Sequence, residues 1–224
     1  MSYLYELHCH TAEVSGCGKI PAAEVVSLLK ENEYHGVVIT DHLTPNDIDK
    51  YDNNIKWKKF VDSFLHGYHS AKQAAIGLDF DVLLGAEIRF PQNNNDYLLY
   101  GLTEEFLYNN AYINHLSLNE FSKIAAAENI VIIQAHPMRN GMTIANPVFI
   151  EGYEVYNGNA RHDSRNNIAF MLSQHFNKIV TSGSDFHQYE DLARGGILTD
   201  IRITDATQLP SLLRSGDYEL KCTP

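Results

Sequence analysis

The sequence predicts one α/β domain over residues 1–224, built as a TIM-like barrel. The length suits a single domain with a sizeable core, and 44% of the residues are hydrophobic. Predicted strands alternate with predicted helices, which indicates either a parallel barrel or an open doubly wound sheet. Imidazoles and carboxylates follow five separate strands. A barrel brings strand ends together at one face, whereas an open sheet spreads them along an edge, so this recurrence favours the barrel.

Each element carries its own signal in the pattern of apolar residues. Short β-branched or alternating runs predict strands at residues 3–8, 36–40, 81–90, 97–102, 129–134, 151–157, 178–187 and 196–203. Helical spacing predicts helices at residues 21–34, 55–77, 117–128, 162–176 and 205–214. The first helix opens on Pro21, at a position that proline favours. The loops at 43–54, 91–96 and 138–148 are expected to determine which substrate binds.

The charge balance limits the class of partner. Seventeen Lys and Arg residues stand against 28 Asp and Glu residues, a formal net charge of -11. Duplex nucleic acid binds extended basic faces and is not expected, whereas a small anionic substrate held by a local cation is compatible. No signal-peptide pattern or membrane-length apolar run is present, so no membrane partner is expected. Cys9, Cys17 and Cys222 lack zinc-finger spacing, which favours a reduced, cytoplasmic protein.

Two histidines begin the series of candidate metal ligands. Alternate side chains of a strand share a side, so His8 and His10 project together while Cys9 faces the core. The other candidates are Asp41 with His42, Glu87, His136, and Asp185 with His187. Singly, each has an ordinary explanation, such as a surface pair, a turn cap or a hydrogen-bonded core histidine. If all of these residues had ordinary roles, each buried polar group would need its own hydrogen-bond partner, whereas one metal cluster would satisfy them all.

Five short motifs resemble those of a known family, in the same order. They are His8-Cys9-His10-Thr11, Thr40-Asp41-His42, Gly85-Ala86-Glu87, Ala135-His136-Pro137 and Gly183-Ser184-Asp185-Phe186-His187. Together they resemble the PHP (polymerase and histidinol phosphatase) superfamily over residues 6 to about 197. The resemblance implies the PHP fold, a distorted (β/α)7 barrel, and a site of two or three divalent metal ions that hydrolyses phosphoesters.

The resemblance also implies ligands for each ion. These are His8, His10, Glu87 and Asp185 for the first, Glu87 and His136 for the second, and His42 and His187 for the third. Glu13 is the nearest candidate for a further ligand in the turn after the first motif. Family members often carry a histidine in the strand after Glu87, where this chain has Asp96 and Tyr97. Two ions and three ions therefore both remain open.

The expected chemistry follows from the ligand types. Mixed imidazole and carboxylate ligands suit zinc, manganese or iron, without choosing among them. Paired ions activate a hydroxide and stabilise an in-line displacement, so Glu87 and Asp185 would act in catalysis through the ions they hold. Arg139 follows His136 and is expected to clamp the phosphate. Weaker candidates for this are Arg194, Arg161 and Lys19, and Glu154 with Asn157 are expected to orient ligands.

The predicted function is a metal-dependent phosphoesterase that hydrolyses a small phosphomonoester, such as a nucleotide, a sugar phosphate or histidinol phosphate. Two alternatives stay open: a 3′-exonuclease on short oligonucleotides, and a non-catalytic metal-binding regulatory module. The nearly complete ligand set favours an enzyme over a non-catalytic module, because clustered carboxylates destabilise a protein that does not need them for catalysis. Six histidines in or beside helices are not expected to bind metal: His35, His66, His69, His115, His162 and His175.

Overall fold

One continuous sheet curls into a nearly closed barrel. The computed structural model describes residues 2–44 and 54–223. The strands in these residues are β1 (Tyr3–Cys9), β2 (Gly36–Ile39), β3 (Asp81–Arg89), β4 (Asp96–Tyr100), β5 (Val131–Gln134), β6 (Gly152–Asn157), β7 (Ile179–Gly183), β8 (Gly195–Thr199) and β9 (Glu219–Cys222). Their order in the sheet is β7-β6-β5-β4-β3-β2-β1-β8-β9.

The barrel closes where the segment after β7 meets β1. Phe186 N–H donates to His8 O (3.0 Å), and His10 N–H donates to Phe186 O (3.0 Å). Cys9 is wholly buried in the core at this junction, as the sequence predicted. The strands β1 to β7 thus make the distorted seven-stranded barrel that was expected, and β8 and β9 extend the sheet beyond β1 as antiparallel strands.

The strand β4 runs antiparallel to both of its neighbours. Only residues 90–95 separate it from β3, and a parallel crossover needs a dozen residues or more. Because its direction is reversed, β4 begins at the end of the barrel where the parallel strands finish. Its first residue, Asp96, therefore lies at the same end as His136, which follows β5.

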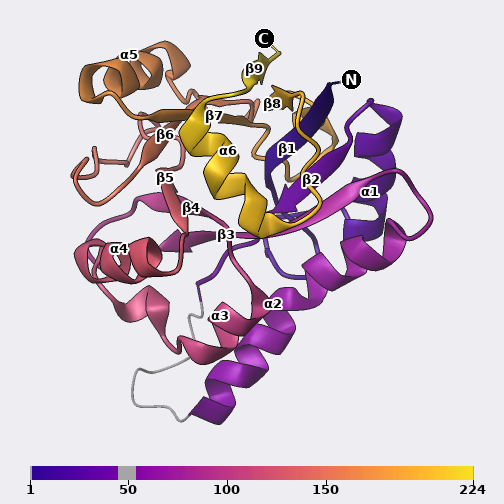
Figure 1. Cartoon of the computed structure of the whole chain (residues 1–224), viewed down its shortest axis with the longest axis horizontal. Helices are drawn as coiled ribbons and strands as arrows, with labels where there is room; N and C mark the ends of the chain where they lie inside the picture. Colours follow the sequence, from indigo (N-terminus) through magenta and orange to yellow (C-terminus); the bar gives the residue numbers. More distant parts are fainter. Residues whose placement is uncertain (1, 45–53, 224) are drawn as a thin grey trace.

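Helices pack against the outside of the barrel (Figure 1). The helices in the described residues are α1 (Ala22–Glu31), α2 (Asn54–Ala74), α3 (Glu104–Asn109), α4 (Leu118–Ala127), α5 (Asn166–Phe176) and α6 (Leu209–Ser215). A large apolar cluster joins the sheet to the outer helices and includes Val26 of α1, Trp57 of α2 and Phe121 of α4. None of the helices in residues 2–44 and 54–223 is both long and apolar enough to cross a membrane.

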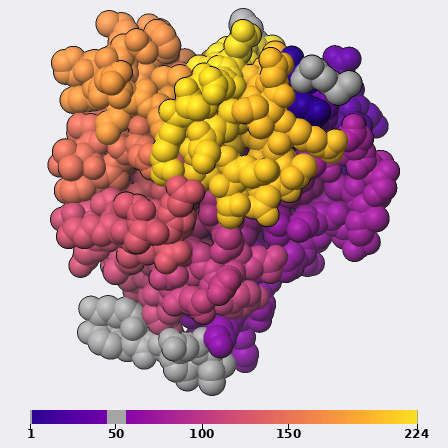
Figure 2. Space-filling view, viewed as in Figure 1, coloured from indigo at the N-terminus to yellow at the C-terminus, as the bar shows by residue number. Residues whose placement is uncertain are grey.

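The helix α6 covers one end of the barrel. A second apolar cluster combines Leu7, Val38, Leu98 and Ile133 of the strands with Leu209, Leu212 and Leu213 of α6. Pro210 lies against Gly101, which follows β4 and is therefore at the opposite end of that strand from Asp96. Figure 2 shows this face, with the C-terminal residues in yellow spread over it. The opposite end of the barrel carries the candidate ligands.

Several boundaries differ from the prediction. The helix α5 begins at Asn166 rather than at 162, because the preceding loop is held to Asn157: Asn166 Nδ2 donates to Asn157 O (3.1 Å). The strand β8 stops at Thr199, whose hydroxyl oxygen accepts from Ile201 N–H (3.2 Å) and turns the chain. The elements α3 and β9 were not predicted. Most of the expected loop 43–54 lies outside the described residues.

Candidate metal centre

Strand ends carry the predicted ligands to one place. His8 and His10 lie at the end of β1, with ring centroids 5.2 Å apart. The other ligands are Glu87 on β3, His42 after β2, His136 after β5, and Asp185 and His187 after β7. All are buried except His42, which is half-buried. Residues that span 180 positions of sequence thus meet at one end of the barrel, as the sequence analysis anticipated.

Glu87 lies at the centre of these side chains. Its Oε1 is 3.1 Å from His136 Nε2 and 3.5 Å from His8 Nε2. Its Oε2 is 3.1 Å from His42 Nδ1 and 3.3 Å from His10 Nε2. One carboxylate therefore contacts imidazoles from three strand ends, which is the arrangement that a bridging ligand requires.

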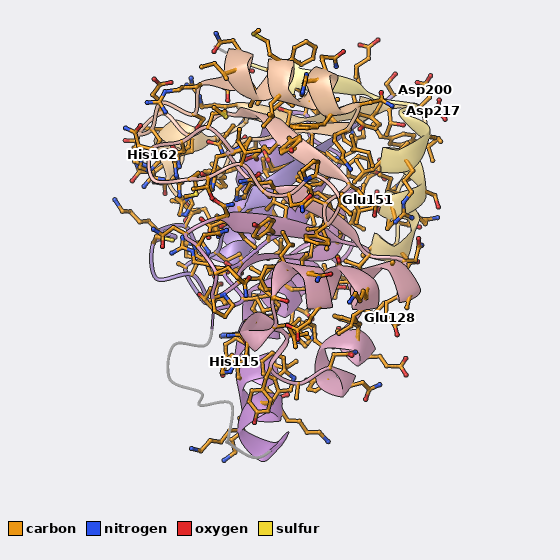
Figure 3. All side chains as sticks on the ribbon, turned by 90° about the vertical axis from the view of Figure 1, so that its left-hand side faces the viewer. His115, Glu128, Glu151, His162, Asp200 and Asp217 are labelled. Carbon is orange, nitrogen blue, oxygen red and sulfur yellow. The ribbon has the colours of Figure 1, made fainter. Side chains whose placement is uncertain are left out.

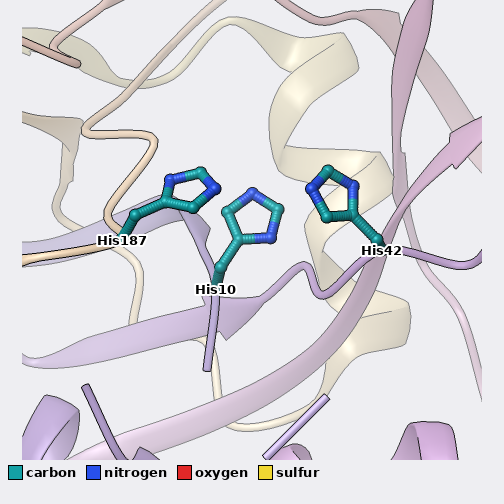
Figure 4. A group of neighbouring side chains, drawn as sticks. All are labelled: His10, His42 and His187. Atoms are coloured by element: carbon teal, nitrogen blue, oxygen red, sulfur yellow. The ribbon is translucent and has the colours of Figure 1, made fainter. Parts of the chain in front are cut away.

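Potential ligand atoms form three groups among the described residues, and within each group they lie no more than 4.8 Å apart. The first group is His8, His10 and Asp185, the second is Glu87, Asp96 and His136, and the third is His10, His42 and His187. Figure 4 shows the third group, with the ring of His10 between those of His187 and His42. His10 thus belongs to two groups.

The donor atoms fit metal ions. Nε2 of His8, Nε2 of His10 and Nδ1 of His136 are buried and have no hydrogen-bond partner. Leaving such an atom unpaired costs about 1–3 kcal/mol. Imidazole nitrogens mixed with carboxylates are ligands of divalent transition metals, so bound ions would satisfy Nε2 of His8 and Nε2 of His10. His136 faces the second group with its other nitrogen, Nε2.

The buried charges shift one another's pKa. Burial alone would lower the pKa of His10, but the neighbouring carboxylates of Asp185 and Glu87 raise it to about 9. Burial alone would raise the pKa of both carboxyl groups, but His8 and its neighbours hold them well below their usual range. Imidazolium and carboxylate therefore compensate each other in the first group.

The other two imidazoles of the third group are neutral. Burial lowers the pKa of His42 to about 4 and that of His187 to about 3. His187 Nδ1 lies 2.8 Å from Asp185 O, an atom that can only accept, so Nδ1 carries the proton and Nε2 carries the lone pair. Neutral imidazole is the form that binds metal.

Glu154 orients two ligands at once. Its Oε1 lies 2.8 Å from His8 Nδ1, and its Oε2 accepts from His136 N–H (2.9 Å). Asn157 Nδ2 donates to Glu154 Oε2 (2.9 Å) and to Asp185 Oδ2 (3.2 Å). These hydrogen bonds agree with the orienting role that the sequence analysis expected for Glu154 and Asn157.

A second orienting network was not predicted. Ser15 Oγ lies 3.2 Å from His10 Nδ1 and donates to Asp41 Oδ1 (2.6 Å). Asp41 also accepts from Thr11 N–H and Thr11 Oγ1, each at 2.7 Å. Burial raises the pKa of Asp41. Asp41 therefore supports His10 from behind, and its place beside His42 in the sequence was the available signal.

Asp96, rather than Tyr97, joins the second group. Its Oδ2 lies 3.9 Å from His136 Nε2, and Arg89 donates to both of its oxygens (2.8 and 2.9 Å). Burial, and then the neighbouring Glu87, raises the pKa of Asp96. The Tyr97 side chain packs in the apolar core instead. A carboxylate thus lies where the resemblance led us to expect a histidine.

Glu13 lies apart from the three groups. Both of its carboxylate oxygens accept from Ala22 N–H at the start of α1 (3.0 Å each). Since it belongs to no ligand group among the described residues, we leave it out of the proposed site.

Arg139 lies beside the first and second groups. Its Nη2 is 3.6 Å from Asp96 Oδ2, and its Nη1 is 3.9 Å from Asp185 Oδ2. Two of the weaker candidates have other partners: Arg161 pairs with Asp191 (3.1 Å), and Lys19 Nζ donates to Gln188 Oε1 (2.8 Å). The third, Arg194, packs against Gly158.

The six histidines that were set aside join none of the groups in residues 2–44 and 54–223. His69 pairs with Glu104 (3.0 Å), and Leu4 N–H donates to His35 Nδ1 (3.1 Å). Figure 3 shows His115 and His162 in separate regions of the molecule. Partial burial, and then the positive charge of Arg139, lowers the pKa of His162.

Known proteins share both the sequence pattern and the fold. The sequence profile of the PHP domain matches residues 6–205. No curated protein matches the chain. A solved structure from Bacteroides vulgatus, described as a two-domain protein containing a predicted PHP-like metal-dependent phosphoesterase, is 14% identical with a TM-score of 0.68. It is matched over 100% of this chain, but the chain spans only 65% of its length.

Two further structures match most of both chains. A proposed metal-dependent phosphoesterase from Bifidobacterium adolescentis is 15% identical, with a TM-score of 0.57 over 94% of this chain and 95% of that one. An amidohydrolase from Chromobacterium violaceum, with bound sulfate and no metal, is 12% identical, with a TM-score of 0.55 over 96% of this chain and 97% of that one. At these identities the likeness shows a common fold.

Proposed function

This chain belongs to the PHP domain family, and on that basis we propose that it is a metal-dependent hydrolase of a small phosphomonoester. The observation that carries the proposal is the convergence of three ligand groups on one end of the barrel, where the buried Nε2 atoms of His8 and His10 lack a hydrogen-bond partner. Two or three divalent ions (zinc, manganese or iron) suit these ligands. When bound, the ions would activate water as the nucleophile and stabilise the charge on the phosphate.

The protein's own residues prepare the ligands. Glu154 accepts from His8 Nδ1, which leaves the lone pair on Nε2, 3.4 Å from Asp185 Oδ1. Glu87 touches imidazoles of all three groups, so it is suited to bridge two ions. Asp185 contacts His8, His10 and His187, so its charge would offset that of a bound ion.

Arg139 would hold the phosphate. Its guanidinium contacts the two carboxylates at distances longer than hydrogen bonds, and its side chain is 22% exposed. It therefore lies between the ligand groups and solvent. A phosphate beside the ions would offer Arg139 two oxygens at once, which suits the planar guanidinium.

A small substrate fits the charge better than a nucleic acid does. The chain carries a net charge of -11, and the nearby Arg161 and Arg165 are engaged with Asp191 and with Met138 O and Asn140. A long polyanion needs several free cations along its path. Cleavage of short oligonucleotides is the second candidate within the same chemistry.

The test combines metal analysis with a substrate screen. Elemental analysis of the purified protein should find more than one equivalent of transition metal. Initial rates with manganese should then be highest for phosphomonoesters in a panel of nucleotides, sugar phosphates, histidinol phosphate, short oligonucleotides and amides. Protein that contains no metal and binds no added manganese or zinc would overturn the proposal. Binding without turnover of any substrate would favour the regulatory module, and turnover of amides alone would assign a different hydrolase.

A further inference from the structure

A thiol lies beside the third ligand group. Cys17 Sγ is 3.1 Å from His187 Nε2. The turn that carries Cys17 is tied to the loop of His187, because Lys19 N–H donates to His187 O (2.8 Å). Gly18 N–H donates to Ser15 O (2.8 Å) and tightens the same turn. Backbone contacts on both sides therefore hold the sulfur at this position.

The third group has only two ligands of its own. His10 also belongs to the first group, with His8 and Asp185. When His10 serves there, only His42 and His187 remain for a third ion, whereas protein zinc sites use three or four side chains. Cys17 and His42 line the same cavity of about 400 Å³, so both reach the space beside this group.

The imidazoles are arranged to receive an ion at this point. The lone pair of His187 is on Nε2, the atom that contacts Cys17, because Nδ1 donates to Asp185 O. His10 Nε2 is fully buried and has no hydrogen-bond partner, and His10 is shared with the first group, so an ion held by His42 and His187 needs a further ligand beside them. Sulfur and nitrogen bound to one tetrahedral zinc ion lie about 3.5 Å apart. The observed 3.1 Å is close to that separation.

We propose that Cys17 is a thiolate ligand of the ion held by His42 and His187, an inference that rests on the proposed function. The second group differs, because two of its three ligands, Glu87 and Asp96, are carboxylates. Thiolate and imidazole select zinc-like ions, whereas carboxylates suit harder ions such as manganese. With Cys17 as a ligand, the third group would be the softer of the two sites.

Cobalt(II) tests the proposal by spectroscopy, without measuring activity. The full-length protein is stripped of metal with a chelator and titrated with cobalt(II), and absorption is recorded for the thiolate-to-cobalt charge-transfer band. The wild type should develop the band, and Cys17→Ser should lose it while still binding cobalt at the other groups. Cys222→Ser, which removes an exposed thiol in β9, is the matched control and should keep the band.

A second measurement uses the reactivity of the thiol. Alkylation of Cys17 by iodoacetamide, followed by mass spectrometry, should be at least about tenfold slower in zinc-loaded protein, because a metal-bound thiolate is not free to attack. Cobalt binding without the band, or a band that persists in Cys17→Ser, overturns the proposal. Equal alkylation rates with and without zinc do the same. A wild type that binds no cobalt at all overturns the proposed function as well.

Discussion

Gly67→Ala should destabilise the protein, although alanine is the better helix former. Gly67 lies in the middle of α2, where alanine normally adds about 1 kcal/mol of stability. Here an added Cβ would overlap Thr11 Oγ1 and lie 2.6 Å from Asp41 Oδ2. The Asp41 carboxylate would have to move, and with it the network that orients His10.

The magnitude follows from three terms. Overpacking a well-filled site costs about 1–3 kcal/mol. Asp41 accepts three hydrogen bonds from Thr11 and Ser15, and losing one bond to a charged group costs about 1.5–3 kcal/mol. Subtracting the gain in helix propensity leaves a loss of about 3 kcal/mol, which lowers Tm by about 6–12 °C in a chain of this size.

The assay is thermal unfolding by circular dichroism, with metal content measured on the same samples. Ser70→Ala, at a partly exposed position of the same helix, is the control and should change Tm by less than about 2 °C. Gly67→Ala should also retain less metal, since Ser15 and His10 shift with Asp41. A variant as stable as the wild type, with full metal content, would refute the steric argument.

Four further outcomes are expected. Asp185→Asn should fold, but it should lose metal and its kcat should fall at least about 100-fold. Asp163→Asn, an exposed control, should keep both metal content and kcat. Near-normal turnover of Asp185→Asn would remove Asp185 from the centre. Arg139→Ala should raise KM about 10- to 100-fold with metal content intact, and an unchanged KM would assign the phosphate to another cation. Glu154→Gln should weaken metal binding about 10- to 100-fold, as equilibrium dialysis would measure, and wild-type affinity would contradict its orienting role. In protein stripped of metal, folding raises the pKa of His10 from 6.5 to about 9. The protonated imidazole therefore stabilises the fold fully below about pH 6.5, and this contribution is lost as the pH rises toward 9. Manganese affinity rises over that interval, because binding needs neutral imidazole. The Tm values of stripped and manganese-loaded protein should therefore diverge between about pH 6.5 and 9. Parallel curves of Tm against pH would contradict this.

The ligand set could be predicted because each ligand lies at or just after the end of a strand. His8, His42, Glu87, His136 and Asp185 are separated by long stretches of sequence, yet barrel topology alone brings strand ends together. No side-chain detail was needed for that step. The resemblance to the PHP superfamily then distinguished ligands from ordinary core histidines.

The turn after β1 could not be predicted in the same way. Within one tight turn, Ser15 faces His10, Cys17 faces His187, and Glu13 faces the start of α1. Side chains in a turn do not alternate between faces as they do in a strand, so their direction cannot be read from their spacing. Glu13 was therefore selected as a candidate ligand only because it is close to His10 in the sequence. The helix start predicted at Pro21 offers free N–H groups to a nearby carboxylate, and Glu13 accepts from one of them, on Ala22.

The reversed strand β4 could have been predicted from loop length. Strand prediction ended one segment at residue 90 and began the next at 97, and the intervening PQNNND is too short for a parallel crossover. A hairpin at this point places Asp96, rather than a residue at the far end of β4, beside His136. Connection length therefore shows which end of β4 lies beside His136, and the alternation of side chains along the strand then separates Asp96 from Tyr97.

The backbone at two ligands shows how the site and the fold constrain each other. His136 has φ of 28° and Asp185 has φ of 51°, in the left-handed region that most residues avoid. Such conformations cost about 1–3 kcal/mol each, although His and Asp adopt them more readily than most residues. Hydrogen bonds hold both in place: Glu154 accepts from His136 N–H, and Asn159 Nδ2 donates to Asp185 O. Glycine would relieve the strain but remove the ligand. The same hydrogen bonds that orient the ligands therefore also offset the backbone strain that placing them requires.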